Sequence, residues 1–277
     1  MKLKYKMKIV TFQGGLGNQM YQYVFYNWLK SQCNDKIYGY YPLKGLKGHN
    51  GLEIQKHFNN IDIPKSGFLI MLCVFFIKIF SKIVKNKSLI SKESRDISLK
   101  SILYEGYWQD LSFFTNFKIE DFEFNVEIDA KNKEVLNKII STNSVSIHIR
   151  RGDYLSPAHY SIYGNICTLE YYDNAISYIE SKIEKPFFFI FSDDIEWVNS
   201  NLNIKDSIII DWNRGEYSVI DMFLMSKCHS NIIANSTFSW WGAFLNSNKS
   251  AISICPKKWF YSKFKDPQIF KDSWKKI

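Results

Sequence analysis

The chain has 277 residues, of which 46% are hydrophobic, and its formal net charge is +9 with a pI near 9.1. A chain of this size can bury one large core or two domains, and its composition shows no collagen-like, disordered or repetitive bias. The lysines are scattered and no zinc-finger or RNA-binding aromatic spacing occurs, so no nucleic acid is expected as a partner, whereas phosphorylated small molecules and anionic lipid stay open.

The amino-terminal region predicts a strand, a glycine-rich turn and a helix. The strand is expected over residues 8–13 and the helix over residues 20–31, joined by the turn Gly14-Gly15-Leu16-Gly17-Asn18-Gln19. Nucleotide-binding α/β domains often begin in this way, but the third glycine of the dinucleotide fingerprint is missing. Gly15 and Gly17 allow a ligand to approach the backbone closely, and Asn18 is expected either to cap the helix or to contact that ligand.

The middle of the chain, residues 40–100, shows little pattern apart from one apolar run over residues 68–85. Lysines are interspersed in the run, and its uninterrupted apolar part is too short to span a bilayer. Two interpretations stay open, a helix buried in the core or an interfacial helix with lysines at its edge. Residues 102–109 then predict a strand that ends in an exposed aromatic cluster suited to a sugar ring, although most such aromatics belong to the core.

From residue 144 onward, short apolar strands alternate with helical segments. Strands are expected over residues 144–149, 187–191, 207–210, 231–234 and 251–255, and helices over residues 169–184, 194–201, 218–227 and 238–246. This alternation predicts βαβ units and a parallel sheet, hence an α/β fold, in which ligands bind beyond the carboxyl ends of the strands. We expect an amino-terminal domain over residues 1–142 and a carboxyl-terminal domain over residues 143–277, with the last helix packed in the second domain or back on the first.

Three polar segments fall at expected strand ends: Arg150-Arg151-Gly152-Asp153, Ser192-Asp193-Asp194 and Asn235-Ser236-Thr237. Only four of the 36 basic residues are arginines, and two of them are neighbours here. A planar guanidinium can bind a phosphate or carboxylate through two parallel hydrogen bonds, so the pair predicts an oxyanion site. The alternatives are an Arg–Asp pair that holds a loop, and ordinary helix capping by the serine, threonine and aspartate side chains. No metal is expected, because two carboxylates without further ligands are weak evidence for one.

Four segments resemble those of bacterial α-1,2-fucosyltransferases of glycosyltransferase family 11, and they occur in the family's order. They are residues 14–23, Gly106-Tyr107-Trp108-Gln109, His148-Ile149-Arg150-Arg151-Gly152-Asp153-Tyr154 and Asn235-Ser236-Thr237-Phe238-Ser239-Trp240-Trp241-Gly242-Ala243. The resemblance implies a GT-B architecture of two Rossmann-like domains facing a cleft, with acceptor contacts in the first domain and the GDP-sugar in the second. It also implies inverting, metal-independent transfer of L-fucose from GDP-fucose to the 2-hydroxyl of a terminal galactose in a surface glycan.

The resemblance further implies roles for individual residues. Arg150 would bind the β-phosphate side of the donor, with Arg151 as support through Asp153, and His148 would lie near the nucleotide. Asp221 would accept from the edge of guanine, and Asn18 would face the reaction centre. The other donor-binding positions implied are Gly15, Gly17, Asp193, Asn235, Ser236, Thr237 and Ser239. Asp153 is a candidate general base, although its alternative role is to orient an arginine.

Two other functions stay open at this point. One is a related glycosyltransferase with another linkage or another GDP-sugar, and the other is a non-catalytic binder of nucleotides or anionic polymers. Five cysteines, an odd number at irregular spacing, predict reduced core residues in a cytosolic protein: Cys33, Cys73, Cys167, Cys228 and Cys255. No long apolar region follows the basic first ten residues, so no signal peptide is expected. We therefore expect a cytoplasmic protein, with peripheral attachment to the inner membrane face through residues 68–85 as an open alternative.

Overall fold

The computed structural model describes residues 7–46, 49–64, 67–84, 87–93, 97–261 and 266–277. Contacts between residues divide the chain into two compact units, Met1–Asn125 and Val126–Ile277. The sequence places a boundary at residue 142 instead. The difference is helix α5 (Ala130–Ser141), which contacts β5 and α9 of the second unit.

The first unit is built on a four-stranded parallel sheet in the order β2-β1-β4-β3. These strands are β1 (Met7–Thr11), β2 (Lys36–Tyr40), β3 (Ile90–Lys92) and β4 (Leu103–Glu105). Its helices are α1 (Leu16–Gln32), α2 (Leu43–Leu46), α3 (Ile54–His57) and α4 (Phe68–Ile83), and its 3₁₀ turns are η1 (Lys87–Leu89), η2 (Leu111–Asn116) and η3 (Ile119–Phe122). Helix α1 begins four residues earlier than expected, directly at the glycine turn.

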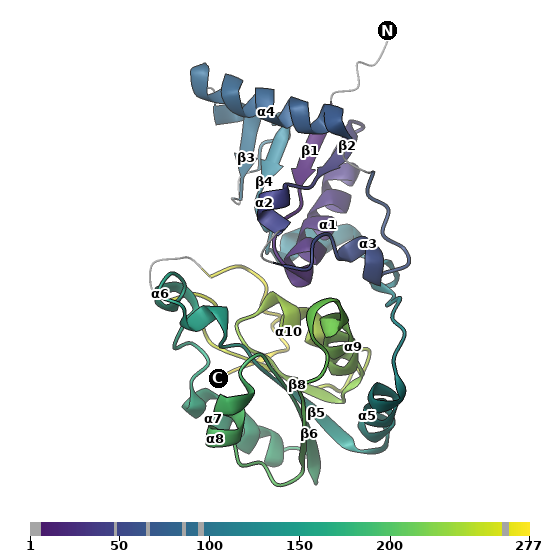
Figure 1. Cartoon of the computed structure of the whole chain (residues 1–277), viewed down its shortest axis with the longest axis vertical. Helices are drawn as coiled ribbons and strands as arrows, with labels where there is room; N and C mark the ends of the chain where they lie inside the picture. The colour runs from purple at the N-terminus through teal and green to yellow at the C-terminus, as the bar shows by residue number, and fades with distance from the viewer. Residues whose placement is uncertain (1–6, 47–48, 65–66, 85–86, 94–96, 262–265) are drawn as a thin grey trace. The chain divides into compact units, whose positions relative to one another are not determined.

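The alternation of side chains along the strands places α1 and α4 on opposite faces of this sheet (Figure 1). Leu103 belongs to a buried cluster with Ile70 and Val74 of α4, whereas its neighbour Tyr104 contacts Phe25 of α1. The expected strand over residues 102–109 is shorter than predicted, and its aromatic cluster is only partly exposed. Trp108 is buried, and its ring stacks on that of Phe25 at 3.9 Å between centroids.

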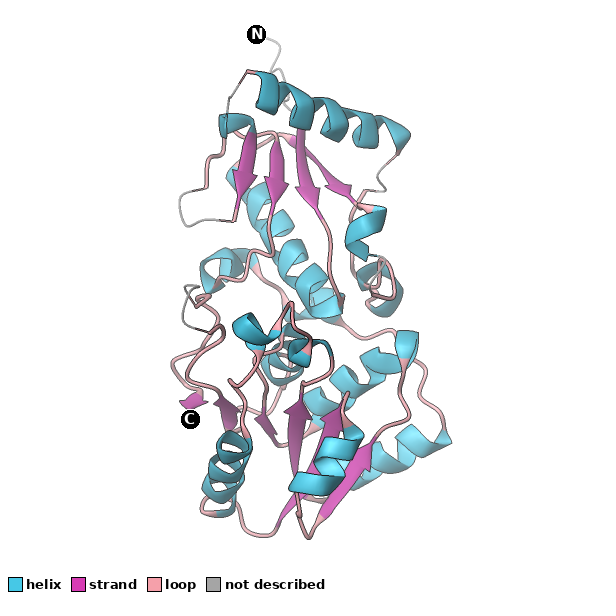
Figure 2. Cartoon of the chain, turned by 60° about the vertical axis from the view of Figure 1, so that its left-hand side comes forward, coloured by secondary structure: helices cyan, strands magenta, loops and turns pink. Residues whose placement is uncertain are grey.

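The second unit contains a six-stranded parallel sheet in the order β10-β9-β8-β5-β6-β7. Its strands are β5 (Asn143–Ile149), β6 (Pro186–Ser192), β7 (Ser207–Ile210), β8 (Ser230–Ile232), β9 (Ser253–Cys255) and β10 (Lys275–Lys276). Besides α5, its helices are α6 (Tyr160–Tyr163), α7 (Leu169–Glu180), α8 (Ile195–Asn201), α9 (Val219–Lys227) and α10 (Thr237–Phe244), with 3₁₀ turns η4 (Asp153–Leu155) and η5 (Gly215–Ser218). The predicted alternation of strands and helices from residue 144 onward is confirmed (Figure 2).

The burial of the second sheet explains why its strands could be predicted from runs of apolar residues. Val145, Ile147 and Ile149 of β5 are fully buried with Ile179 of α7 and Ile232 of β8. Strands covered on both sides appear as nearly continuous apolar runs, which is the pattern used for the prediction. The last described helix, α10, contacts α9 of its own unit. Within the described residues, no helix combines the length and apolarity that a bilayer span requires.

Candidate functional site

The candidate site lies at the carboxyl edge of the second sheet. Strands β5 and β6 are parallel and in register up to the pair Ile149 and Ser192, and β8 lies on the other side of β5. The segments that follow these three strands therefore emerge at one edge, which is where α/β sheets bind ligands. The three polar segments expected at strand ends are brought together here.

Arg150 is held between two carboxylates. One terminal nitrogen lies 2.7 Å from Oδ1 of Asp153, and the other lies 2.9 Å from Oδ2 of Asp193. The guanidinium also lies 5.6 Å from the ring centroid of Tyr154. Because a guanidinium carries five N–H donors, two carboxylate contacts leave it able to bind a further oxyanion.

Arg151 contacts Asp193 and Asp194, and not Asp153 as expected. Its Nε lies 3.0 Å from Oδ2 of Asp194, and its guanidinium lies 4.4 Å from the centroid of the Trp197 ring. Its backbone N–H donates to Oδ1 of Asp193 at 2.8 Å. Asp153 contacts Arg150 instead, so the expectation that it supports Arg151 is wrong.

The acidic pair after β6 therefore orients the two arginines. Asp194 also caps α8, because its Oδ1 accepts from the backbone N–H of Trp197 at 3.0 Å. The capping alternative is thus correct for Asp194, but it accounts for only one of that side chain's oxygens. Among the residues described, no group of three or more His, Cys, Asp and Glu side chains could hold a metal ion.

His148 lies beneath the arginine pair as a neutral, buried imidazole. Its ring lies 5.8 Å from that of Phe238 in α10, and its Nδ1 has no hydrogen-bond partner in the described part of the chain. Burial lowers the pKa of His148 to about 4, helped by Arg150 and opposed by Asp193. A buried ring nitrogen without a partner is costly, which makes it a candidate for contact with a bound molecule.

In the segment after β8, Asn235 has a structural role, whereas Ser236 and Thr237 form the turn that leads into α10. The Asn235 amide donates to the backbone oxygens of Tyr163 and Trp259, both at 3.2 Å, so it holds two loops together. Ser236 occupies the N-cap position of α10, but its hydroxyl makes no capping hydrogen bond. The capping alternative is therefore wrong for Ser236. Its side chain and Thr237 stand beside the first N–H groups of α10, which have no partner within a helix and favour anions.

Ser239 is less available than Ser236. It is fully buried, and its hydroxyl donates back to the Ser236 carbonyl at 3.3 Å. Its contacts stabilise the first turn of α10. The resemblance implies that Ser239 contributes to the phosphate pocket, but its geometry gives no direct support for that role.

Asp221 lies in the first turn of α9. Two asparagines that were not predicted as site residues, Asn213 and Asn132, form a hydrogen-bonded chain with it. The Asn213 amide donates to Asp221 Oδ1 at 2.7 Å, and Asn132 of α5 contacts Asn213 in turn. Burial raises the pKa of Asp221 from 3.8 to about 7, against the opposite effects of Asn213 and Arg214.

Arg214 is a third arginine at this edge. One of its terminal nitrogens donates to the Ser192 carbonyl at 3.5 Å, and its Nε donates to the Asp211 carbonyl at 2.9 Å. The scarcity of arginine in the chain was the signal that could have identified it. Its exposed position makes it a second candidate cation for an anionic ligand.

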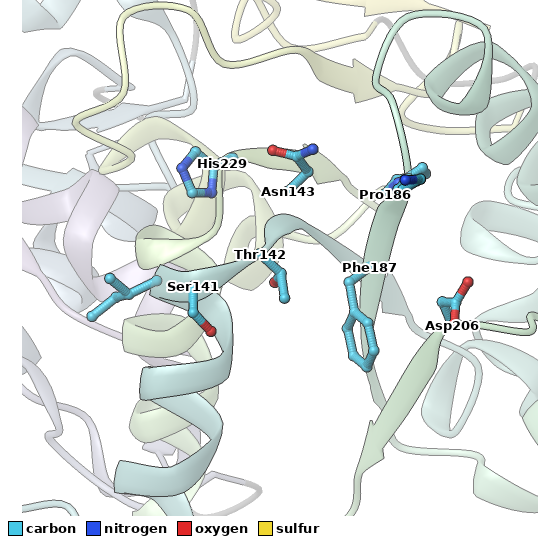
Figure 3. A pocket seen from close by; sticks show the side chains of 9 residues that line it. Ser141, Thr142, Asn143, Pro186, Phe187, Asp206 and His229 are labelled. Carbon is cyan, nitrogen blue, oxygen red and sulfur yellow. The ribbon is translucent and has the colours of Figure 1, made fainter.

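Hollows lined by described residues of the second unit lie at opposite edges of its sheet. One of about 170 Å³ is lined by Arg150, Arg151, Tyr154, Trp197 and Asn235, among others. The larger, of about 540 Å³, lies at the amino ends of β5 and β6 between residues such as Thr142, Asn143 and Phe187 (Figure 3). Ligands of parallel sheets bind at carboxyl ends, so the smaller hollow belongs to the candidate site despite its size.

The remaining expected residues, Gly15, Gly17 and Asn18, belong to the first unit. Gly15 is the N-cap residue of α1, and Asn18 Oδ1 accepts from Gln109 Nε2 at 3.1 Å. The alternative that Asn18 caps the helix is therefore wrong. Gly14 has a φ of +79°, and a Cβ there would lie 2.7 Å from Asn18 Nδ2, so this turn position requires glycine.

Comparisons with known proteins find similarity to glycosyltransferases. The family described as Glycosyl transferase family 11 matches residues 4–277. An α-1,2-colitosyltransferase of Escherichia coli is 35% identical over 273 residues, covering 91% of this chain and 92% of that protein. The O-antigen biosynthesis glycosyltransferase WbnK of Escherichia coli is 43% identical over 143 residues, covering 50% of this chain and 47% of that protein.

Solved structures support the fold. Fucosyltransferase NodZ from Bradyrhizobium aligns with a TM-score of 0.52 at 12% identity, covering 86% of this chain and 92% of that chain. A glycosyl transferase family 9 protein from Veillonella parvula aligns with a TM-score of 0.51 at 13% identity, covering 100% and 88%. At these identities the likeness concerns the fold alone, which is α/β with parallel sheets and of the GT-B type.

Proposed function

The chain belongs to glycosyltransferase family 11, and from this premise we propose that it transfers L-fucose from GDP-fucose to the 2-hydroxyl of a terminal galactose. The observation that carries the donor part of the proposal is Arg150, held by Asp153 and Asp193 at the carboxyl edge of the second sheet. The acceptor would be a galactose-terminated glycan of the cell surface, such as an O antigen, and the reaction would take place in the cytoplasm.

In the proposed reaction, the acceptor oxygen attacks the anomeric carbon of fucose while the bond to GDP breaks, with inversion of configuration. Negative charge develops on the departing β-phosphate, where a guanidinium and backbone N–H groups stabilise it. Arg150 and the start of α10, with Ser236 and Thr237, would supply these groups. Arg151 would act by anchoring the loop that carries Arg150. We propose that no metal cofactor is used, because Asp193 and Asp194 already bind the arginines.

The proton of the acceptor hydroxyl must pass to a base within hydrogen-bond reach. Asp153 is the candidate, since its carboxylate is about half exposed and its Oδ1 contacts a single terminal nitrogen of Arg150. His148 is buried and neutral at its lowered pKa, so we assign it a contact with the donor and no proton transfer. Asn18 remains the proposed contact on the acceptor side.

A second donor has a specific observation in its favour. The relative that matches almost the full length of the chain is named a colitosyltransferase, and colitose is L-fucose without its 3-hydroxyl. That relative's name states the same α-1,2 linkage as the reaction proposed here, so the two candidates differ in one donor hydroxyl. A site that hydrogen-bonds this hydroxyl rejects the sugar lacking it by about 10⁴- to 10⁵-fold, whereas an apolar contact discriminates by about 10² or less.

A donor panel tests the proposed function. The purified chain is supplied with a galactose-terminated acceptor and, in turn, GDP-fucose, GDP-colitose, GDP-mannose and UDP-galactose, with and without EDTA, and the product linkage is read by NMR. We expect α-1,2-linked product from GDP-fucose, unaffected by EDTA. If only GDP-colitose is turned over, the donor sugar is colitose and the proposal of fucose is wrong. A linkage other than α-1,2 would make the proposed transfer to the 2-hydroxyl of galactose wrong. Saturable GDP binding without turnover of any donor would favour the non-catalytic alternative.

The pH dependence of GDP binding tests the role proposed for Asp221. Only its ionised carboxylate can accept from both N1–H and N2–H of guanine, and its pKa is raised to about 7. GDP affinity should therefore rise about tenfold per pH unit below that pKa and level off above it. Calorimetric titration of wild type and Asp221→Asn over this range measures the effect. Ionisation of the GDP phosphate affects both proteins equally, so profiles of the same shape would contradict the assignment.

A further inference from the structure

Helix α4 (Phe68–Ile83) is apolar over most of its circumference, with Lys78, Ser81 and Lys82 as its polar residues, yet only one side of it is packed. Ile70 and Val74 are buried against Ile9 and Leu103 of the sheet, and Cys73 and Ile77 are partly buried beside them. Spacings of three and four residues define a single stripe along the helix. A soluble helix with one such stripe normally carries polar residues on the opposite face, whereas a helix that is apolar all round is normally buried.

The opposite face of α4 is apolar and exposed. Leu69, Phe76 and Ile83, each seven residues apart, form an outward line and are 74%, 62% and 73% exposed. Five more exposed apolar side chains of the helix flank this line: Phe68, Met71, Phe75, Ile79 and Phe80. Figure 2 shows α4 along one side of its sheet, without another described element of its own unit over its outer face. A contiguous apolar surface of this kind marks an interaction site.

The charged residues of the segment that contains α4 all have one sign. Residues 63–92 contain six lysines and no acidic residue. Lys78 lies on the edge between the packed and exposed faces, with its Nζ 2.6 Å from Oε1 of Glu105 in β4. Lys82, one turn further on, is exposed. The apolar surface is therefore bordered by Lys78, which is paired with Glu105, and by Lys82, which makes no ion pair with the described residues.

We propose that α4 docks on the surface of an anionic lipid bilayer, with its outer apolar face inserted among the headgroups and the lysines against the phosphates. An apolar helix face edged by lysine is the form that lies in the plane of a membrane interface, and the anionic leaflet attracts each nearby lysine. The partner is a lipid surface and not a second copy of the chain, because pairing two α4 helices would bring lysines together in a segment without acidic residues. The inference is independent of the reaction proposed above.

Flotation of the full-length chain with vesicles tests the proposal. Vesicles of phosphatidylcholine alone are compared with vesicles that also contain phosphatidylglycerol, at low and high salt. Wild type should float with the anionic vesicles and be largely released by salt. The triple variant Leu69→Gln, Phe76→Gln, Ile83→Gln should lose at least about tenfold in partitioning, since three exposed apolar side chains no longer insert. Lys82→Gln should lose about fivefold, on anionic vesicles only.

A matched control replaces three exposed apolar residues elsewhere by glutamine: Leu99, Ile119 and Ile140. This control should float as wild type does, and circular dichroism should show the same helix content in all variants. Failure of wild type to float, or equal flotation of the α4 triple variant and wild type, would overturn the proposal. A concentration-dependent dimer that the α4 substitutions abolish, in a protein that does not bind vesicles, would overturn it in favour of a second copy.

Discussion

Replacement of Arg150 by alanine is expected to lower kcat for sugar transfer about a hundredfold to a thousandfold, the usual effect of removing one preorganised donor to a developing oxyanion. The fold should survive, because the Arg150 side chain is 33% exposed and ion pairs of that exposure contribute about 1 kcal/mol or less. Steady-state kinetics with GDP-fucose, together with thermal unfolding, measure both effects.

Three companion variants locate the cause of the loss. Arg150→Lys keeps the charge but cannot reach Asp193 and a phosphate with the same planar geometry, so it should recover only part of the activity. Arg151→Ala should act more on stability, since its guanidinium contacts Asp194 and Trp197. Arg150→Ala leaves Asp193 without its guanidinium partner beside the diphosphate, so adding Asp193→Asn shows how much of the loss is repulsion by that carboxylate. An Arg150→Ala enzyme with more than about a tenth of wild-type kcat would contradict the assignment.

The second large effect is expected on stability, from Gln19→Leu in α1. Gln19 is fully buried, and all four of its hydrogen-bonding positions are used. Its amide donates to the carbonyls of Gly14 and Gly51 at 2.9 Å, and its oxygen accepts from the N–H groups of Glu53 and Ile54 at 2.9 and 3.2 Å. Leucine would leave these four backbone groups without partners at about 1–3 kcal/mol each. Allowing for relaxation, we expect a loss of about 3 kcal/mol or more in the free energy of unfolding.

Gln32→Leu is the matched control, because Gln32 lies on the same helix and is exposed. Its effect should stay within about 0.5 kcal/mol. Urea denaturation compares the two variants with wild type, and a Gln19→Leu protein within about 1 kcal/mol of wild type would show that the loops do not depend on this amide. Gln19 belongs to a segment that resembles the family, yet its contacts are those of a scaffold that holds the glycine turn beside residues 51–54.

The alternating half of the chain was predictable because its signal is local. Each buried strand, such as β5 or β6, is a short apolar run of its own, and each helix between them shows its own period. Helix α5 was missed although Asp129 caps it and Val135 and Ile139 form its buried face. Lysines and asparagines occupy half of its other positions, and the short apolar stripe was too weak to stand out.

The candidate site was predictable in position but not in its contacts. Parallel strands align their carboxyl ends, so polar segments after β5, β6 and β8 had to meet once the sheet was recognised. Which carboxylate contacts which arginine depends on side-chain directions across neighbouring loops. The expectation that Asp153 orients an arginine is met by Arg150, but the contact of Arg151 with Asp194 was not predicted. Arg214, which reaches the Ser192 carbonyl from the loop after β7, was overlooked.

The sequence by itself determined the α/β class, the order of elements from residue 144 onward and the three polar strand ends, because these depend on periodicities of neighbouring residues. Only the tertiary structure decided the strand orders, the hydrogen bonds of Gln19, the partners of Arg150 and Arg151, and the outward face of α4. The physical reason is that these features join residues far apart in the chain. In α4 in particular, the sequence gives little indication of which side faces the sheet, because apolar residues line both the packed and the exposed side.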